Sequence, residues 1–388
     1  MPLYYYSIKK DIAKVRMSRD LIGLAILAIL CIVISPFYKK QEYTKPTVKP
    51  LNIKDIDIHI KSKTENPKNI VVLIGSFLPI TVAGSEMSSY ETIKYLRSRG
   101  HSIIIFVDKY KVNEYDGFKI YKYDQNDPFC ISELEKCDII LFSLSEDPKN
   151  FELVSKVNKP TFLFIHIITE YHWILAHKVT FPLYIIYNSH MTQDNILTIH
   201  DNMRMIPYVN INQFKPLSSL TIHNNVVCLI NCNPNKGADM FNTLAKRMSD
   251  VQFLGVKGGY SEQITDNSIA NLTYMETQSD IRVVFKQIGI LLMPSKNETW
   301  GRTAVEAMAS GVPVIHSESA GLVECMGGAG ICCNRYDKDE WEAAIRRILG
   351  DPAYREHLRQ NGFRRVKEIE IEQNRGRQEL AVKIEKDT

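Results

Sequence analysis

Short apolar runs alternate with amphipathic stretches along most of the chain, and this alternation constrains the fold more than any other feature. Residues 69–75 (NIVVLIG) are one such run, and it ends in glycine as a buried parallel strand often does. A helical stretch from Ser85 to Leu96 follows, with Ser85 as the expected N-cap and Gly100 as the expected stop. The next run, 101–107 (HSIIIFV), completes a βαβ unit. A doubly wound α/β sheet is therefore expected from about residue 69 to residue 212, with further strands at 139–142, 161–165 and 184–187.

The same alternation starts again in the second half of the chain. A charged tail at 355–388 is expected to be helical, after further strands and helices. Two Rossmann-like domains are therefore predicted, at 69–212 and 213–388, and ligands in such sheets bind beyond the carboxyl ends of the strands. The expected strands of the second domain are 225–230, 251–255, 288–293, 312–316 and 330–333, and its expected helices are 238–248 and 339–349.

The segment before the first strand has a different character. Residues 21–37 (LIGLAILAILCIVISPF) carry no charge and are near the short limit for a helix that spans a bilayer. We interpret Leu21 to Phe37 as a single-pass transmembrane anchor that follows an N-terminal segment, 1–20, and precedes a tether, 38–68. A cleaved signal peptide and a buried core helix are the alternatives, and no small-residue cleavage site follows the run. Basic residues flank both sides equally, so the positive-inside rule leaves the orientation open.

Composition limits which cellular compartment and which classes of partner are expected for the protein. The formal net charge is only +4 over 388 residues, which gives no argument for a nucleic-acid partner. The 8 cysteines show no paired CxxC units, which favours a reducing compartment. Two N-glycosylation sequons, 271–273 and 297–299, bear on the same question, because a glycan at the second would block the candidate site described next. We therefore expect a membrane protein whose folded part is cytosolic.

Two glutamates lie in the stretch 295–318, on either side of a glycine turn. Glu298 precedes Gly301, and Glu306 lies on a helix expected to begin near Arg302. The free N–H groups of Gly301, Arg302 and Thr303 would form an anion site at the helix N-terminus, and Gly301 lets a phosphate approach the backbone closely. Carboxylates suit hydroxyl groups, so the pair fits the ribose and the sugar that flank the diphosphate of a sugar nucleotide. The alternative is an ion pair between Glu306 and Arg302, four residues apart on the helix surface, and spacing alone slightly favours it.

The stretch 294–315 (PSKNETWGRTAVEAMASGVPVI) resembles the glutamate-x7-glutamate signature of the retaining GT-B glycosyltransferases, the "group 1" family, also called family 4. The resemblance extends over about 70–349 and is stronger in the second domain. It implies a GT-B fold of two facing Rossmann-like domains, which transfers a sugar from a nucleoside diphosphate sugar to a hydroxyl acceptor. It also implies that Glu298 contacts hydroxyls of the donor sugar and that Glu306 holds the ribose.

Other positions match this family less closely. Lys236-Gly237 resembles the family's Lys-Gly, whose lysine meets the donor diphosphate. Gly84 lies in a loop that resembles the family's glycine-containing loop and would approach the donor phosphate or the acceptor. His166 follows a strand where the family often has a histidine near the transferred sugar, and a structural histidine is the equal alternative. Asn231 stands where the family usually has an arginine, with Lys257 and Arg302 as candidates to supply the missing charge. The turn 319–324 has one glycine where the family often has two.

The resemblance implies no metal and no cofactor other than the sugar-nucleotide donor, because helix N-termini and basic side chains neutralise the leaving diphosphate. Asp55 and Asp57 form a literal DxD, a manganese motif of the other glycosyltransferase fold, but they lie in the tether and are interpreted as chance. We predict a membrane-anchored, retaining, hexosyltransferase-like enzyme with a glycan, lipid-linked or protein acceptor. A non-catalytic scaffold of the same fold, suggested by Asn231, and a sugar-nucleotide epimerase are the alternatives.

Overall fold

The computed structural model describes residues 63–144, 148–167, 178–196, 198–215, 225–259 and 261–386. The predicted anchor at 21–37, the segment before it, the DxD of Asp55 and Asp57 and most of the tether lie outside these residues. Within the described residues, no helix combines the length and the apolar character that a membrane crossing requires. The anchor therefore stays a prediction.

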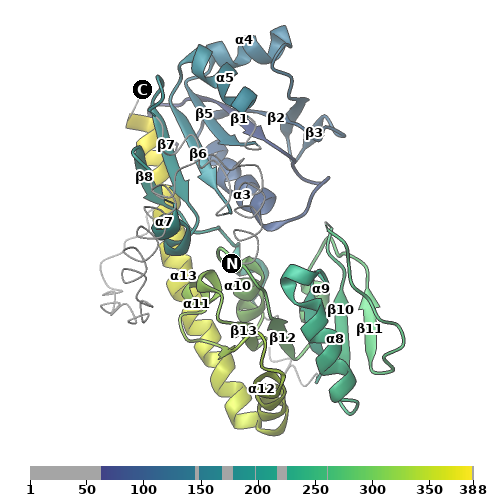
Figure 1. Cartoon of the computed structure of the whole chain (residues 1–388). Helices are drawn as coiled ribbons and strands as arrows, with labels where there is room; N and C mark the ends of the chain where they lie inside the picture. Colours follow the sequence, from purple (N-terminus) through teal and green to yellow (C-terminus); the bar gives the residue numbers. More distant parts are fainter. Residues whose placement is uncertain are drawn as a thin grey trace, which may run out of the picture. The chain divides into compact units, whose positions relative to one another are not determined.

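An eight-stranded sheet is built from the first half of the described chain, in the order β3-β4-β2-β1-β5-β6-β7-β8 (Figure 1). Neighbouring strands are parallel except for the antiparallel β3–β4 pair. The strands are β1 (Asn69–Ile74), β2 (Ser102–Val107), β3 (Glu114–Tyr115), β4 (Phe118–Lys122), β5 (Ile139–Ser143), β6 (Thr161–Ile165), β7 (Leu183–Tyr187) and β8 (Asp201–Arg204). The described helices between them are α3 (Gly84–Ser98), α4 (Pro128–Lys136), α5 (Pro148–Val157) and α7 (His190–Asn195).

The central strands of this sheet form where the sequence is apolar on both faces. Every residue of β1 after Asn69 is buried, and so is every residue of β6, as parallel strands covered by helices on both faces require. The predicted cap of the first helix was wrong. α3 begins at Gly84 with Ala83 as the N-cap, and the alanine has no side-chain atom that could cap the helix. Ser85 lies inside the first turn, where its hydroxyl donates to Glu86. Gly100, with a φ of 105°, follows the end of α3 as predicted.

A second, six-stranded sheet is parallel throughout, in the order β11-β10-β9-β12-β13-β14. This order places β9, β12 and β13 side by side, so the loops that leave their carboxyl ends are neighbours. The strands are β9 (Val227–Ile230), β10 (Phe253–Val256), β11 (Leu272–Met275), β12 (Ile290–Met293), β13 (Val314–Ser317) and β14 (Ile331–Cys333). The helical segments are η3 (Ile211–Gln213), η4 (Pro234–Lys236), α8 (Ala238–Arg247), α9 (Arg282–Phe285), α10 (Arg302–Ala309), α11 (Ala320–Met326) and α12 (Lys338–Gly350).

The charged tail is one long helix, α13 (Pro352–Lys386), drawn in yellow in Figure 1. It contacts α10 and α12 of the second half and α3 of the first. Val366 lies in a core of the second half, whereas Leu380 lies in the core beside the first sheet. Arg99 holds the end of the helix with two hydrogen bonds to the Glu385 carboxylate, at 2.7 and 2.9 Å. One helix therefore packs against both halves of the chain through apolar side chains, and the Arg99–Glu385 ion pair fixes its end.

Candidate functional site

Three loops meet at the carboxyl ends of β9, β12 and β13. The Lys296 N–H donates to the Asn235 carbonyl at 2.7 Å, which joins the loop after β12 to the loop after β9. The Glu298 N–H donates to the Ser319 hydroxyl at 2.9 Å, which joins the loop after β12 to the turn after β13. These bonds fix the backbone around Glu298 from both sides. The predicted site thus lies where a doubly wound sheet binds its ligands.

Lys236 and Glu298 form an ion pair at this meeting point. The Lys236 Nζ lies 2.5 Å from the Glu298 Oε2, and the two side chains are 19% and 16% exposed. The pair joins residues 62 positions apart in the chain. The structure therefore brings together two residues that the sequence assigned to one site, and each satisfies the charge of the other.

Glycines give the loops their shape. Gly301, the N-cap of α10, has a φ of 142°, and Gly237, the N-cap of α8, has a φ of 89°, in the region where other residues are strained. A Cβ on Gly237 would lie 2.5 Å from the Pro294 carbonyl oxygen, so the loops after β9 and β12 touch at this glycine. Gly321 is packed just as closely against the backbone of Glu298. α10 then begins at Arg302, with Thr303 in its half-buried first turn.

Arg302 and Glu306 form the ion pair that the sequence left open. The Arg302 Nε lies 2.8 Å from the Glu306 Oε1, and the side chains are 11% and 10% exposed. The pair is therefore buried, unlike the surface pair that helix spacing suggested. Burial raises the pKa of the Glu306 carboxyl, and the Arg302 charge acts against that rise. The Arg302 guanidinium also donates from Nη1 to the Tyr208 carbonyl, at 2.5 Å.

Asn231 has a backbone role that its sequence position did not reveal. Its φ is 71°, in the left-handed region that asparagine tolerates better than most residues. Its side-chain oxygen accepts hydrogen bonds from Asn233 Nδ2 at 2.9 Å and from Gln263 Nε2 at 3.0 Å. The two cations named as candidates to supply the missing charge are both paired with carboxylates, Lys257 with Glu276 at 2.6 Å and Arg302 with Glu306. Each of these charges is thus already balanced by a carboxylate.

The predicted residues of the first half lie at the carboxyl ends of their strands. Gly84 opens α3 after the loop from β1, and a Cβ there would meet nothing within 4 Å. His166 follows β6, and its carbonyl accepts from the Thr299 hydroxyl at 2.8 Å, which brings it to the loop of Glu298. Burial lowers the pKa of His166 to about 4, so the ring is neutral near neutral pH. Its buried Nε2 has no hydrogen-bond partner among the described residues.

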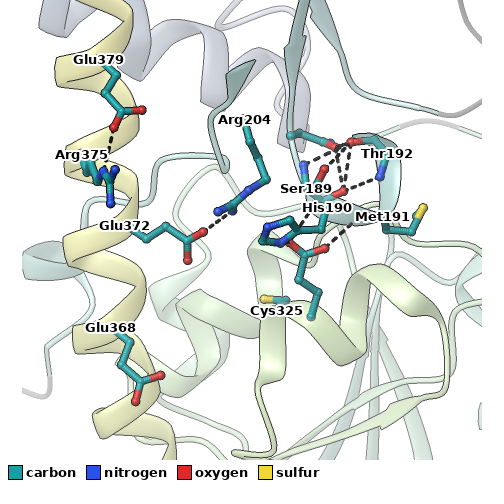
Figure 2. A network of polar contacts seen from close by, with 12 residues as sticks. Ser189, His190, Met191, Thr192, Arg204, Cys325, Glu368, Glu372, Arg375 and Glu379 are labelled. Carbon is teal, nitrogen blue, oxygen red and sulfur yellow. Dashed lines mark hydrogen bonds and ion pairs between the residues drawn. The ribbon is translucent and has the colours of Figure 1, made fainter. Parts of the chain in front are cut away.

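Glu324 is a functional candidate that sequence reasoning left aside. Its carboxylate accepts from the backbone N–H groups of His190, at 2.9 Å, and Met191, at 3.1 Å. The His190 Nδ1 lies 3.0 Å from the same carboxylate. Ser189 and Thr192 close the start of α7 with reciprocal side-chain bonds, as the dashed lines of Figure 2 show. A carboxylate from α11 thus satisfies the N-terminus of a helix in the other half of the chain. In the sequence, the one feature that pointed to Glu324 was its position at the end of the turn 319–324, which has one glycine where the family often has two.

Nothing in the described part of the chain gathers three or more metal-binding side chains of the His, Cys, Asp or Glu type. The acidic groups of the site are instead each paired with a base or a backbone donor. The described site therefore offers the carboxylates of Glu298, Glu306 and Glu324, the cations Lys236 and Arg302, and the N-terminus of α10.

Residues 224–365, which include all of these second-half loops, match the family model described as Glycosyl transferases group 1. The second half of the chain thus contains a domain of the group 1 glycosyltransferase family. The matched region begins just before β9 and ends within α13, so it contains Lys236, Glu298, Arg302 and Glu306 but neither Gly84 nor His166.

Curated relatives match only part of the chain. A D-inositol 3-phosphate glycosyltransferase from Nocardia farcinica is 31% identical over 99 residues, 24% of this chain and 21% of that protein. An MMP alpha-(1->4)-mannosyltransferase from Mycolicibacterium hassiacum is 29% identical over 138 residues, 34% of each protein. The matched segments thus span about a third or less of these relatives' length.

Solved structures resemble this chain over most of its length. Anabaena Alr3699/HepE, crystallised in complex with UDP and glucose, has a TM-score of 0.68 at 16% identity, over 82% of this chain and 100% of that chain. WaaG, a glycosyltransferase involved in lipopolysaccharide biosynthesis, has a TM-score of 0.61 at 10% identity, over 81% and 99%. At these identities the likeness is one of fold: the α/β GT-B fold with two Rossmann-like parallel sheets.

Proposed function

We propose that the protein is a retaining glycosyltransferase that moves a sugar from a nucleoside diphosphate sugar to a hydroxyl acceptor. The observation that carries the proposal is the meeting of Lys236 and Glu298 at 2.5 Å, beside the N-terminus of α10 in a domain of the group 1 family. The solved complexes of Alr3699/HepE with UDP and glucose support a donor of this class. No metal or further cofactor is part of the proposed reaction.

The ion pair suggests how the site receives its donor. Lys236 and Glu298 neutralise each other, and a diphosphate brings negative charge that competes for Lys236. When Lys236 turns to the diphosphate, Glu298 becomes free to accept hydrogen bonds from the sugar hydroxyls. The backbone N–H groups at the start of α10 and the Lys236 charge then stabilise the departing diphosphate. In this scheme Glu306 holds the ribose, and the acceptor attacks from the face that the diphosphate leaves.

The donor site is tested on the full chain with three sugar nucleotides: UDP-glucose, GDP-mannose and ADP-glucose. A donor at about 100 times its Kd should stabilise the fold by about 2.7 kcal/mol, seen as a higher Tm. Lys236→Met should weaken donor binding by about tenfold or more, because it removes a charge-assisted contact. Lys246→Met is the matched control, because Lys246 forms an exposed pair with Asp266 at 2.8 Å, outside the site.

Three outcomes separate the alternatives. Stabilisation by none of the donors, with no release of a nucleoside diphosphate, would refute the proposal. Binding without turnover, with no effect of Glu306→Ala on the assay, would favour a non-catalytic scaffold. A free epimerised sugar formed without an acceptor would favour an epimerase.

The membrane anchor is part of the same proposal. We infer that residues 21–37 hold the protein in a membrane with its folded part in the cytosol, and that the acceptor is a glycan, lipid-linked or protein hydroxyl near that membrane. Protease added to sealed vesicles with the lumen inside should digest the folded part. Full protection of that part would refute the cytosolic placement.

A further inference from the structure

We propose that Arg302 is a positioning residue, which holds the Glu306 carboxylate ready for a ribose and does not bind the donor diphosphate. The inference rests on the proposed function, because it takes Glu306 as the ribose-binding residue. It differs from the sequence prediction, which placed Arg302 at the anion site of the helix N-terminus.

The geometry of the Arg302 guanidinium supports this role. Its Nε pairs with the Glu306 Oε1 at 2.8 Å, one helical turn along α10. Its Nη1 donates to the Tyr208 carbonyl at 2.5 Å, in the segment that links the two sheets. The guanidinium is therefore held between a carboxylate and a carbonyl. With only 11% of its side chain exposed, it has two partners inside the protein before any ligand arrives.

The neighbourhood of Arg302 contains charges from both halves of the chain. Burial raises the pKa of Glu91, on α3, and the Arg302 charge opposes that rise. Arg377, on α13, lies over the ring of Tyr208 at 3.4 Å from its centroid. Arg302 thus pairs with Glu306 and also acts on the Glu91 carboxyl, whose pKa is lowered by Lys94 and Arg377 as well.

Several titratable or charged groups on the elements packed against α10 have partners other than Glu306. They include Arg359, bonded to the Gly311 carbonyl, Arg365, bonded to the Cys325 and Glu324 carbonyls, Glu324, bonded to the start of α7, Glu372, bonded to Arg204, Cys325, whose thiol donates to the Gly301 carbonyl, and the buried His316, whose Nδ1 lies 2.8 Å from the Ser317 carbonyl.

The expected consequence concerns the charge state of Glu306. An ionised carboxyl group offers both oxygens as acceptors to the two ribose hydroxyls, whereas protonation turns one of the oxygens into a donor and weakens the other as an acceptor. Glu306 is 8% exposed, and its burial favours the neutral form. Arg302 favours the ionised form and fixes its orientation. Without that charge the pKa of Glu306 rises further, so the ribose-binding form is lost at a higher pH as the solution is acidified.

The experiment compares UDP with uridine on the full chain, by calorimetry and NMR titration, at about pH 6 and about pH 8.5. Arg302→Met should weaken the binding of both ligands by the same factor, about 10- to 100-fold at the lower pH, with partial recovery at the higher pH. Arg302→Lys keeps the charge and should restore most of the wild-type pH profile. Arg282→Met is the control, because Arg282 pairs with Asp280 on an exposed surface. GDP with guanosine and ADP with adenosine serve if UDP does not bind.

Each other outcome overturns a stated part of the reasoning. Weaker binding of UDP with unchanged binding of uridine would show that Arg302 binds the diphosphate. An unchanged pH profile in Arg302→Met would show a merely structural role. If the wild type binds none of the three nucleotides at either pH, the proposed function fails and the inference fails with it. If Arg302→Met does not fold, Arg302→Gln carries the same comparison.

Discussion

Replacing Gly321 by alanine should disturb the proposed donor site through a single methyl group. Gly321 is the second residue of α11, and its backbone has an ordinary helical conformation that alanine adopts readily. A Cβ there would lie 2.3 Å from the Glu298 carbonyl oxygen and 2.4 Å from the Thr299 carbonyl carbon. Both are backbone atoms, so no side-chain rotation relieves the overlap.

The size of the effect follows from these distances. Ordinary van der Waals contact begins at 3.4 Å, so α11 and the Glu298 loop have to separate by about 1 Å. Overpacking of this kind costs about 1–3 kcal/mol of unfolding free energy. A displacement of about 1 Å at a catalytic group lowers the rate about 100-fold. We therefore expect both a lower urea midpoint and a loss of about two orders of magnitude in kcat/KM.

The assay measures the release of nucleoside diphosphate and the urea unfolding of the same preparations. Gly350→Ala is the matched control, because a Cβ on Gly350 meets nothing within 4 Å. It should leave kcat/KM unchanged and the unfolding free energy within about 1 kcal/mol of wild type. A Gly321→Ala variant with wild-type kcat/KM and midpoint would refute the idea that this close contact sets the position of Glu298.

Two further substitutions test contacts that the structure revealed. Asn271→Ala should cost about 2–4 kcal/mol of unfolding free energy, because the two N–H groups of the buried Asn271 amide are shared among three backbone carbonyls at 2.7 to 3.0 Å from its Nδ2. Asn297→Ala, at an exposed asparagine, is the control, and a loss below about 1 kcal/mol for Asn271→Ala in urea unfolding would contradict the reasoning. Glu324→Gln should cost about 1 kcal/mol of unfolding free energy by weakening the contact with the start of α7. Glu368→Gln, at a glutamate whose side chain is 54% exposed, should cost less than about 0.5 kcal/mol, and equal losses in thermal unfolding would contradict this assignment.

The sheets were predictable because their central strands are covered on both faces. Such strands appear in the sequence as apolar runs, so β1 and β12 lie within the runs expected for them. Edge strands carry no such signal. β3 has two residues, and β8 (DNMR) has no fully buried residue, so neither was predicted. Their strand character comes from pairing with β4 and β7, which a local pattern does not contain.

The site was predictable as a set of loops but not as a set of contacts. The strand order brings Lys236 near Glu298, and the family signature marks both, yet their ion pair spans 62 positions. The contact of Glu324 with the start of α7 spans 134 and 133 positions, and it depends on how the two halves meet. The buried state of the Arg302–Glu306 pair was hidden for the same reason. Helix spacing predicts which side chains share a face, while Tyr208 and the packing of α13 determine that this face is covered.

Asn231 shows why a departure from a family pattern has to be weighed against local backbone geometry. An arginine at this position would have to adopt the left-handed conformation of Asn231, which costs about 1–2 kcal/mol for most residues. It would also remove the amide oxygen that Asn233 and Gln263 use, and crowd Gly258, where an added Cβ would lie only 2.2 Å from that oxygen. The asparagine is therefore an integrated part of this loop, and its lack of charge is no argument by itself for a non-catalytic scaffold. If the site neutralises a diphosphate, Lys236 and the N-terminus of α10 have to do so, which is why Lys236→Met is the sharper test of activity.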